Sequence, residues 1–382
     1  MQTYEQVDSY MNEVGLKYVK DATSLLAGLI MRTDKKYAEE VAKQLNDRAQ
    51  GLPVSNEAFY ELKNRNLDGS IYISAAFDGG VFRHIGNMII DCADRLSGEV
   101  LDLCCDCGIV TCFMAKNCPE SHFTGIDINE SAIENAKQLA ERLGLTNIEF
   151  ICADVYEMEL GKQFDAVTSF RSLLDAADKE TKGLNYIGYR KDREDSYQKA
   201  FAPFARAVSA HLKDNGFVLS VERYTAEYGW LGWMQALSEQ GINATAKSGL
   251  MRAQDISSVK EYSVTYAVKA EGAAPLDVYN ESLSKQFKSG TGYDGGMAEF
   301  ALYYDSVDGI DFYEITKNDR VIHLYAIAHN EKGKGMYFDA SNDNRKIKYY
   351  NIKKEENILK DIEKNLSLYD EDVYVIRRFS AE

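Results

Sequence analysis

Hydrophobic and polar positions repeat with the period of an α-helix through much of the first hundred residues. One hydrophobic face joins residues three and four positions apart: Val7, Tyr10, Met11, Val14, Tyr18, Leu25, Leu26 and Leu29. The pattern predicts a second helix over 37–49, ended by the turn formers at 51–53, and a third over 81–96. We therefore expect residues 1–78 to form a helical extension.

From residue 99 the pattern changes to short hydrophobic strands that alternate with helices. Strands are expected at 100–105, 122–128, 148–153, 164–170 and 217–222, with helical patterns up to 115 and over 130–143 and 196–212. Strands and helices that alternate in this way form a parallel sheet with helices on both faces. A further helix over 230–240 precedes two strand-like runs, 243–250 and 261–269, which indicate a closing hairpin with one antiparallel strand.

A third pattern begins after Ala273-Ala274-Pro275, which we interpret as a domain boundary. Strands joined by turns are expected at 300–304, 311–316, 321–329 and 336–339, then a helix over 355–366 and a last strand over 373–379. The sequence thus predicts three parts: the extension 1–78, an α/β domain 79–272 and an α+β domain 273–382, whose role the sequence does not indicate.

The chain is acidic, with 44 Lys+Arg, 60 Asp+Glu and a net charge of −16 over 382 residues. Because Lys and Arg hold the phosphates of nucleic acids, this balance argues against a nucleic-acid partner. Residues 1–10 lack the basic and apolar segments of a signal peptide. The apolar stretch 25–31 is far shorter than the ~20 residues of a membrane span, so we expect no membrane association.

All 7 cysteines fall within residues 92–152. An odd number of thiols around a predicted strand-turn-helix indicates a reducing compartment, so we expect a cytoplasmic location. Cys104 and Cys107 form a C-x-x-C pair, but no second pair with matching histidines follows at metal-binding spacing. We therefore predict small buried thiols and no metal site.

The most informative stretch is Glu99-Val-Leu-Asp-Leu-Cys-Cys-Asp-Cys-Gly108, a strand followed by a tight turn and a helix. Such a turn brings backbone N–H groups and a helix N-terminus close to a ligand. Asp127 ends the second strand, where its carboxylate can accept hydrogen bonds from both hydroxyls of a ribose. After the third strand, Asp154 can accept a hydrogen bond from an adenine amino group, and Val155 can pack on the ring. These positions indicate a nucleoside site.

This arrangement resembles the class I S-adenosylmethionine-dependent methyltransferases over about residues 79–270. The family's glycine-rich turn corresponds to 100–108, its ribose-binding acid to Asp127 and its adenine-contacting acid to Asp154. Its fourth strand often opens with Phe-Asp, as at 164–165, and a Leu-Lys and a turn glycine introduce its fifth strand, as at 212–216. The resemblance implies a doubly wound, seven-stranded α/β sheet with its last strand antiparallel, and S-adenosylmethionine as the cofactor.

The resemblance also implies cofactor contacts along one edge of the sheet. The residues that it assigns to the cofactor are Asp102, Cys104, Asp106, Gly108, Asp127, Ile128, Asp154, Val155, Ser169 and Phe170. The family's turn is D-x-G-x-G-x-G, and here Cys104 and Asp106 replace its first two glycines. Cys104 is small and is expected to keep a φ below zero, whereas Asp tolerates a left-handed backbone better than most residues. Asp102 is expected either to bond turn amides or to contact the ligand.

Methyl transfer depends more on positioning and desolvating two reactants than on a strong acid–base pair. A base helps when the acceptor is a hydroxyl or an ammonium. Ligands bind outside the carboxyl ends of the strands in open α/β sheets, so side chains near the ends of the fourth and fifth strands are candidates. The candidate catalytic residues are Arg171, Glu222, Arg223, Tyr186 and Tyr189.

We therefore predict an S-adenosylmethionine-dependent methyltransferase with a small-molecule acceptor. In the resembled family, an Asn-Pro-Pro-Tyr motif accompanies methylation of planar nitrogens in nucleic acids and proteins, and Phe170-Arg171-Ser172-Leu173 stands in its place. The helical extension is expected to form a lid over the acceptor, a homodimer contact, or both. Two alternatives stay open: an RNA or protein methyltransferase that uses the C-terminal domain for recognition, and a non-catalytic nucleoside-binding protein of the same fold.

Overall fold

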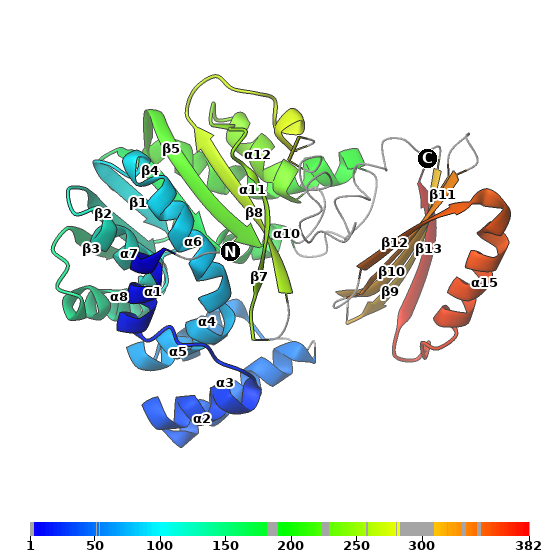
Figure 1. Cartoon of the computed structure of the whole chain (residues 1–382), viewed down its shortest axis with the longest axis horizontal. Coiled ribbons are helices and arrows are strands. Elements are labelled where there is room, and N and C mark those ends of the chain that lie inside the picture. The colour runs from blue at the N-terminus through cyan, green and yellow to red at the C-terminus, as the bar shows by residue number, and fades with distance from the viewer. Residues whose placement is uncertain are drawn as a thin grey trace.

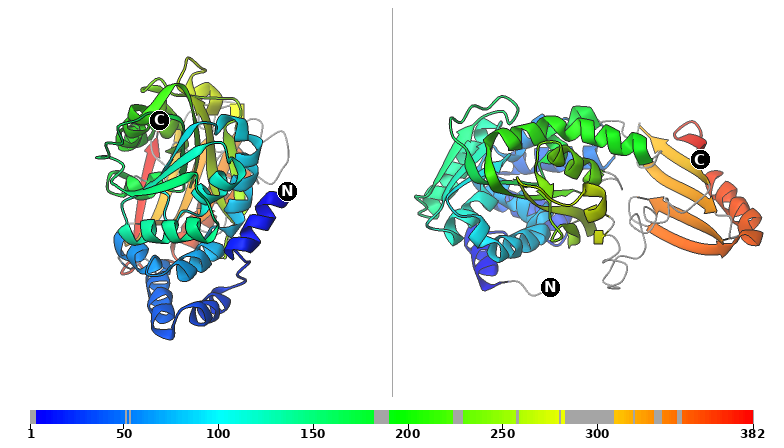
Figure 2. Two further views of the ribbon diagram at one scale, coloured as in Figure 1. Left: turned by 90° about the vertical axis from the view of Figure 1, so that its left-hand side faces the viewer. Right: turned by 90° about the horizontal axis from the view of Figure 1, so that it is seen from above.

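A computed structural model of the chain shows two β-sheets with helices packed on them (Figure 1). The larger sheet uses residues up to 268 and the smaller sheet residues from 309 onward (Figure 2). The structure describes residues 4–50, 52, 54–181, 190–223, 229–256, 259–279, 281–282, 309–318, 320–329, 334–341 and 345–381.

Among the described residues, the larger sheet has eight strands in the order β3-β2-β1-β4-β5-β8-β6, with β7 paired to β8. Strands β1 to β5 are parallel, and β8 runs antiparallel to β5, which confirms the predicted fold class. Their bounds are β1 Glu99–Leu103, β2 His122–Asp127, β3 Ile148–Cys152, β4 Phe164–Phe170, β5 Leu212–Arg223, β6 Asn243–Ala244, β7 Gly249–Gln254 and β8 Val259–Val268. The prediction of one strand over 243–250 was wrong, because a turn at 246–247 divides it into β6 and β7.

The larger sheet is buried on both faces. Successive strand residues point to opposite faces, so Val100 and Phe123 join one apolar cluster while Leu101 and Ile126 join the other. Helices α6, α7 and α8 contribute to the first cluster, and α11 and α12 to the second. The bounds of these helices are α6 Gly79–Asp91, α7 Ile109–Asn117, α8 Glu130–Arg142, α11 Arg190–His211 and α12 Gly229–Ser238.

The helical extension is confirmed, but its first helical pattern is divided between two helices. Gly15 has a φ of 88°, a left-handed conformation that ends the first helix, and Tyr18 beyond it is 79 % exposed. The side chains of Asp21 and Asp34 accept hydrogen bonds from the backbone N–H groups three residues later and so begin the second and third helices. The helices are α1 Glu5–Val14, α2 Ala22–Arg32, α3 Lys35–Ala49, α4 Asn56–Lys63 and α5 Leu67–Phe77.

The smaller sheet is antiparallel throughout its described strands, in the order β12-β11-β10-β9-β13. Helix α15, Glu355–Leu366, confirms the helix predicted over 355–366. It buries Ile362 and Leu366 against Ile315 and Ile327 of the sheet. The strand over 345–351 was not predicted, and the expected strand at 300–304 lies outside the described residues. The strands are β9 Gly309–Lys317, β10 Arg320–His329, β11 Lys334–Ser341, β12 Arg345–Asn351 and β13 Val375–Ala381.

None of the described helices is both long enough and apolar enough to cross a lipid bilayer. Four of the cysteines are buried as expected, but Cys152 is exposed. All seven thiols are free.

The close packing of α12 on α11 leads to a stability prediction. A Cβ atom at Gly232 would lie 2.6 Å from the Cβ of Tyr197 and 2.8 Å from the backbone nitrogen of Gln198. Gly232→Ala should therefore lower the free energy of unfolding by roughly 1–3 kcal/mol, measured by urea denaturation. The control is Gly249→Ala, because a Cβ there meets no atom within 4 Å. Equal effects of the two substitutions would contradict the prediction.

Candidate functional site

The turn between β1 and α7 has a left-handed backbone at three alternate positions. The φ angles are 54° at Cys104, 48° at Asp106 and 73° at Gly108. The expectation of a φ below zero at Cys104 was wrong, because the turn imposes its conformation on the residue that replaces glycine. A Cβ at Gly108 would lie 2.8 Å from the Cβ of Ala136 and 2.9 Å from the ring of Phe150, so only glycine fits there.

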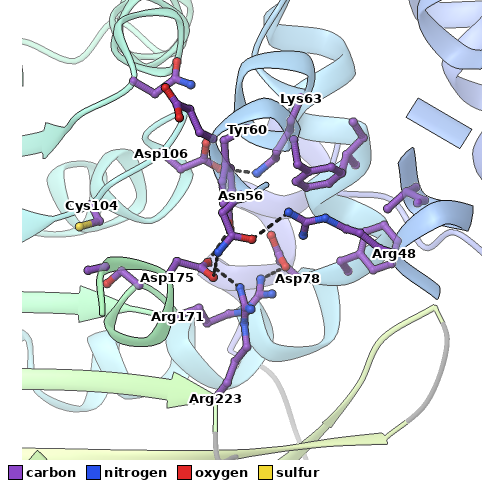
Figure 3. Close-up of a pocket in the computed structure, with 18 of the residues that line it drawn as sticks. Arg48, Asn56, Tyr60, Lys63, Asp78, Cys104, Asp106, Arg171, Asp175 and Arg223 are labelled. Carbon is purple, nitrogen blue, oxygen red and sulfur yellow. Dashed lines mark hydrogen bonds and ion pairs between the residues drawn. The ribbon is translucent and has the colours of Figure 1, made fainter. Parts of the chain in front are cut away.

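The carboxylate of Asp106 is neutralised by the helical extension. It forms an ion pair with Lys63 at the end of α4, and the side-chain amide of Asn64 donates to its other oxygen at 2.8 Å. Lys63 is 4 % exposed. Burial alone would lower the pKa of the Lys63 ammonium, but the charge of Asp106 reverses this effect and raises the pKa. The pair therefore stays charged, and Figure 3 shows the side chain of Lys63 directed at Asp106.

Asp127 connects the turn to the end of β2. Its Oδ2 accepts from the backbone N–H of Asp106 at 2.8 Å and its Oδ1 from that of Asn129 at 2.9 Å. Burial, followed by the nearby charge of Asp106, raises the pKa of Asp127 to about 6. A carboxylate oxygen has more than one acceptor position, so both oxygens can take further hydrogen bonds.

Asp154 follows β3 and accepts from the backbone N–H of Tyr156 at 2.9 Å. Asp154, Val155, Asp127 and Ile128 all line one cleft of about 2430 Å³, together with Cys104 and Asp106 of the turn. The structure thus brings together, at the carboxyl ends of the first three strands, six of the ten residues that the sequence assigned to a cofactor.

Asp102 lies behind the turn and outside this cleft. It is 2 % exposed and accepts from the hydroxyls of Thr111 at 2.5 Å and Thr168 at 2.8 Å. Burial raises the pKa of Asp102 to about 6. Threonine hydroxyls therefore take the place of the expected turn amides, so that Asp102 ties β1 to α7 and β4, and its contact with a ligand stays a prediction.

Ser169 and Glu222 are also not among the residues that line the cleft. The Ser169 hydroxyl donates to Glu222 at 2.5 Å, and the other carboxylate oxygen accepts from the backbone N–H of Leu173 at 3.0 Å. Glu222 is 3 % exposed, and burial raises its pKa to about 7. The sequence predicted that Ser169 contacts the cofactor and that Glu222 acts on the acceptor. Neither prediction agrees with this arrangement, because the two side chains are hydrogen-bonded to each other. Phe170, which follows Ser169 at the end of β4, does line the cleft.

Arg171 and Arg223 lie at the ends of β4 and β5 and line the cleft, as the sequence predicts. Arg171 forms an ion pair with Asp78, and Arg223 with Asp175 at 2.9 Å. Tyr60 of α4 donates to the same carboxylate of Asp175 at 2.8 Å. The candidates Tyr186 and Tyr189 lie outside the described residues.

The sequence analysis missed the residues that the extension contributes: Asn56, Tyr60, Lys63 and Asn64. No motif marks them, because a lysine or a tyrosine on an amphipathic helix is usually a surface or packing residue. Among the described residues, no group of three or more His, Cys, Asp or Glu is arranged to hold a metal ion.

The contact between Lys63 and Asp106 leads to a second prediction. Lys63→Met leaves a carboxylate without its counter-ion and should cost about 3 kcal/mol of unfolding free energy, the low end for a broken buried pair, because Asp106 keeps 28 % exposure. Lys63→Met with Asp106→Gly should recover most of this loss, measured by urea denaturation. The control Lys116→Met removes an exposed pair with Glu13 and should cost under about 1 kcal/mol. A double variant as unstable as the single variant would contradict the prediction.

The segment that contains the turn is similar to proteins of a known family. Residues 100–185 match the family model described as a methyltransferase domain. A malonyl-[acyl-carrier protein] O-methyltransferase of Acetivibrio thermocellus is 33 % identical over 92 residues, covering 23 % of this chain and 31 % of that protein. A tRNA (guanine-N(7)-)-methyltransferase of Rubrobacter xylanophilus is 40 % identical over 58 residues, 15 % of this chain and 26 % of that protein. The chain thus spans about a third or less of the length of these two curated relatives.

Solved structures of methyltransferases also align with part of this chain. The N-methyltransferase NodS of Bradyrhizobium japonicum, in complex with S-adenosyl-L-homocysteine, aligns with 54 % of this chain and 95 % of its own, at 14 % identity and a TM-score of 0.38. The magnesium protoporphyrin IX methyltransferase of Synechocystis PCC 6803, with bound S-adenosylmethionine, aligns with 63 % and 96 %, at 14 % identity and a TM-score of 0.36. The family match of residues 100–185 and the observed strand order both agree with the methyltransferase domain that the sequence predicts.

Proposed function

We propose that the whole protein is an S-adenosylmethionine-dependent methyltransferase that acts on a small molecule bound inside the cleft. The observation that carries the proposal is that the turn, Asp127 and Asp154 open onto the same cleft as the ends of β4 and β5. Ligand sites in open α/β sheets lie outside these strand ends. The cleft, at about 2430 Å³, exceeds the 300–1,000 Å³ of a typical small-ligand pocket, so it has room for a cofactor and an acceptor.

The residues present fit the cofactor. Gly108 lets the backbone pass where a Cβ would collide with Ala136, and Asp127 keeps acceptor capacity for two ribose hydroxyls. The ion pair of Asp106 and Lys63 offers opposite charges to the ammonium and the carboxylate of an amino-acid moiety. When bound, the cofactor supplies a methyl group on a positively charged sulfur. The chain binds and orients both partners, and α2, α3 and α4 shield them from water.

The enclosure of the cleft favours a small acceptor over a polymer. Side chains of α2, α3 and α4 line it opposite the strand ends, and the chain is strongly acidic overall. The names of the relatives include methyltransferases of malonyl-[acyl-carrier protein], of tRNA and, in Papaver bracteatum, of (S)-tetrahydroprotoberberine, so they do not choose between acceptors. The contacts of Asp106 support a working site over a non-catalytic one, since its charge is neutralised within the fold. The cytoplasmic location, the homodimer, the two boundaries between the three predicted parts and a recognition role of the C-terminal domain stay predictions.

Cofactor binding is tested by calorimetric titration with S-adenosylhomocysteine. We expect a Kd in the micromolar range, about −8 kcal/mol, and at least tenfold weaker binding in Asp127→Ala. Asp94→Ala is the control, because Asp94 is an exposed acid in the segment before β1. A well-folded protein that binds neither S-adenosylhomocysteine nor S-adenosylmethionine would contradict the proposed function.

The raised pKa of Asp127 predicts the pH dependence of this binding. Only the ionised carboxylate accepts hydrogen bonds from both ribose hydroxyls, and burial holds its pKa at about 6. Affinity for S-adenosylhomocysteine should therefore rise as the pH increases from 5 to 7, and fall as Asp127 becomes protonated. Asp127→Asn, which cannot ionise, should bind more weakly and lose this rise. An unchanged pH profile in the variant would assign the dependence to another group.

A further inference from the structure

One region of the cleft is lined by apolar side chains of the helical extension. Helix α2 packs on α3 and α5, and α4 packs on the same two helices, so the four helices surround a common space. All the cleft residues that α2 and α5 contribute are apolar. The region that we call the apolar chamber is defined by Leu26 and Leu29 of α2, Ala42 and Leu45 of α3, Phe59 of α4 and Phe77 of α5.

Some side chains of the apolar chamber are buried and others are half-buried. Leu29 is 1 % exposed and Phe59 is 8 % exposed, so both belong to the core of the extension. Leu26, Leu45 and Phe77 pack against that core but are only half-buried, so they present apolar surface to the cleft. Enclosed apolar surface with a few polar groups nearby is the usual lining of a pocket for an organic ligand.

The polar side chains that the extension adds to the cleft beside the apolar chamber are paired within the protein. Arg48 donates to Asn56 at 2.9 Å, and Asn56 donates to Asp175 at 3.3 Å. Asp175 also accepts from Tyr60 at 2.8 Å and pairs with Arg223 at 2.9 Å. Figure 3 shows these residues as one network. Because these groups already have partners, a ligand in this part of the cleft gains its new contacts mainly from the apolar chamber.

We propose that the methyl acceptor has an apolar body, alkyl or aromatic, that lies in the apolar chamber. This inference rests on the proposed function, because it describes the acceptor that binds in the same cleft. Transfer of apolar surface from water into the chamber stabilises the complex. The apolar chamber therefore selects apolar molecules over polar molecules of the same size.

The apolar chamber and the cofactor residues are separate parts of one cleft. The residues that line the cleft and are assigned to the cofactor come from the turn and from the ends of β2, β3 and β4, whereas the apolar chamber belongs to α2, α3, α4 and α5. The acceptor body and the cofactor therefore bind at the same time, as a transfer between them requires.

The test uses N-phenyl-1-naphthylamine, an uncharged aromatic dye whose fluorescence rises when it leaves water. Titration of the whole chain should show one saturable site with a Kd in the micromolar range. The titration is repeated with saturating S-adenosylhomocysteine, and the Kd should stay similar because the two ligands occupy different parts of the cleft. Displacement of the dye by S-adenosylhomocysteine would overturn the proposal.

Two variants change the apolar chamber in different ways. Ala42→Phe fills it without adding a polar group and should weaken dye binding by about tenfold or more. Leu26→Gln places an amide in it and should weaken binding by roughly fivefold or more; it also tests the proposal if Ala42→Phe does not fold. The matched control is Ile30→Gln, which should leave the Kd unchanged, because Ile30 lies on the same helix, is 39 % exposed and does not line the cleft.

Calorimetry with S-adenosylhomocysteine separates the cofactor part of the cleft from the apolar chamber. Its Kd should be the same in the wild type and in all three variants, since none of them changes a residue assigned to the cofactor. A protein that binds S-adenosylhomocysteine but not the dye, or that binds the dye equally well as wild type, Ala42→Phe and Leu26→Gln, would overturn the inference. A protein that binds the dye as expected but binds neither S-adenosylhomocysteine nor S-adenosylmethionine would instead overturn the proposed function.

Discussion

The contact of Lys63 and Asn64 with Asp106 determines how the two parts around the cleft fit together. It places a charged side chain from the helical extension against a left-handed turn of the sheet. Asn64 continues the connection, since it accepts from Ser70 and its backbone oxygen accepts from Asn135 of α8. Without this network the turn would carry an uncompensated carboxylate, and the extension would lose one of its polar connections to the α/β domain. A turn that departs from the usual glycine pattern is thus matched by a compensating charge.

Several carboxyl groups share the same edge of the sheet, and each is accommodated by a different neighbour. Asp102 accepts from two threonine hydroxyls, and Glu222 from two serine hydroxyls and a backbone N–H. Asp127 uses the backbone of the turn. Burial raises the pKa of all three. Of the three, only Asp127 lines the large cleft, so the fold separates an acid that faces the cleft from acids that connect its strands and helices.

The helical extension supplies one wall of the cleft. The carboxyl ends of β1 to β5 would form an open edge by themselves, and α2, α3 and α4 add the opposite wall. This wall carries both the apolar side chains of α2 and α3 and the polar residues Tyr60 and Asn56 that reach Asp175. The chemistry of this part of the cleft therefore comes from two segments more than a hundred residues apart in the chain.

Local patterns determined the fold class, the strand ends that carry Asp127 and Asp154, and the helix over 355–366, because strand alternation and helical periodicity reflect burial of one face. Tertiary structure decided the rest. Gly15 and the turn at 246–247 interrupted runs that looked continuous, and the turn forced Cys104 to a φ of 54°. The direction of Glu222 and the partners of Asp106 depend on charges brought together from distant segments. A sequence pattern records how each segment is buried, whereas a buried charge is stabilised by whichever partner the packing brings to it.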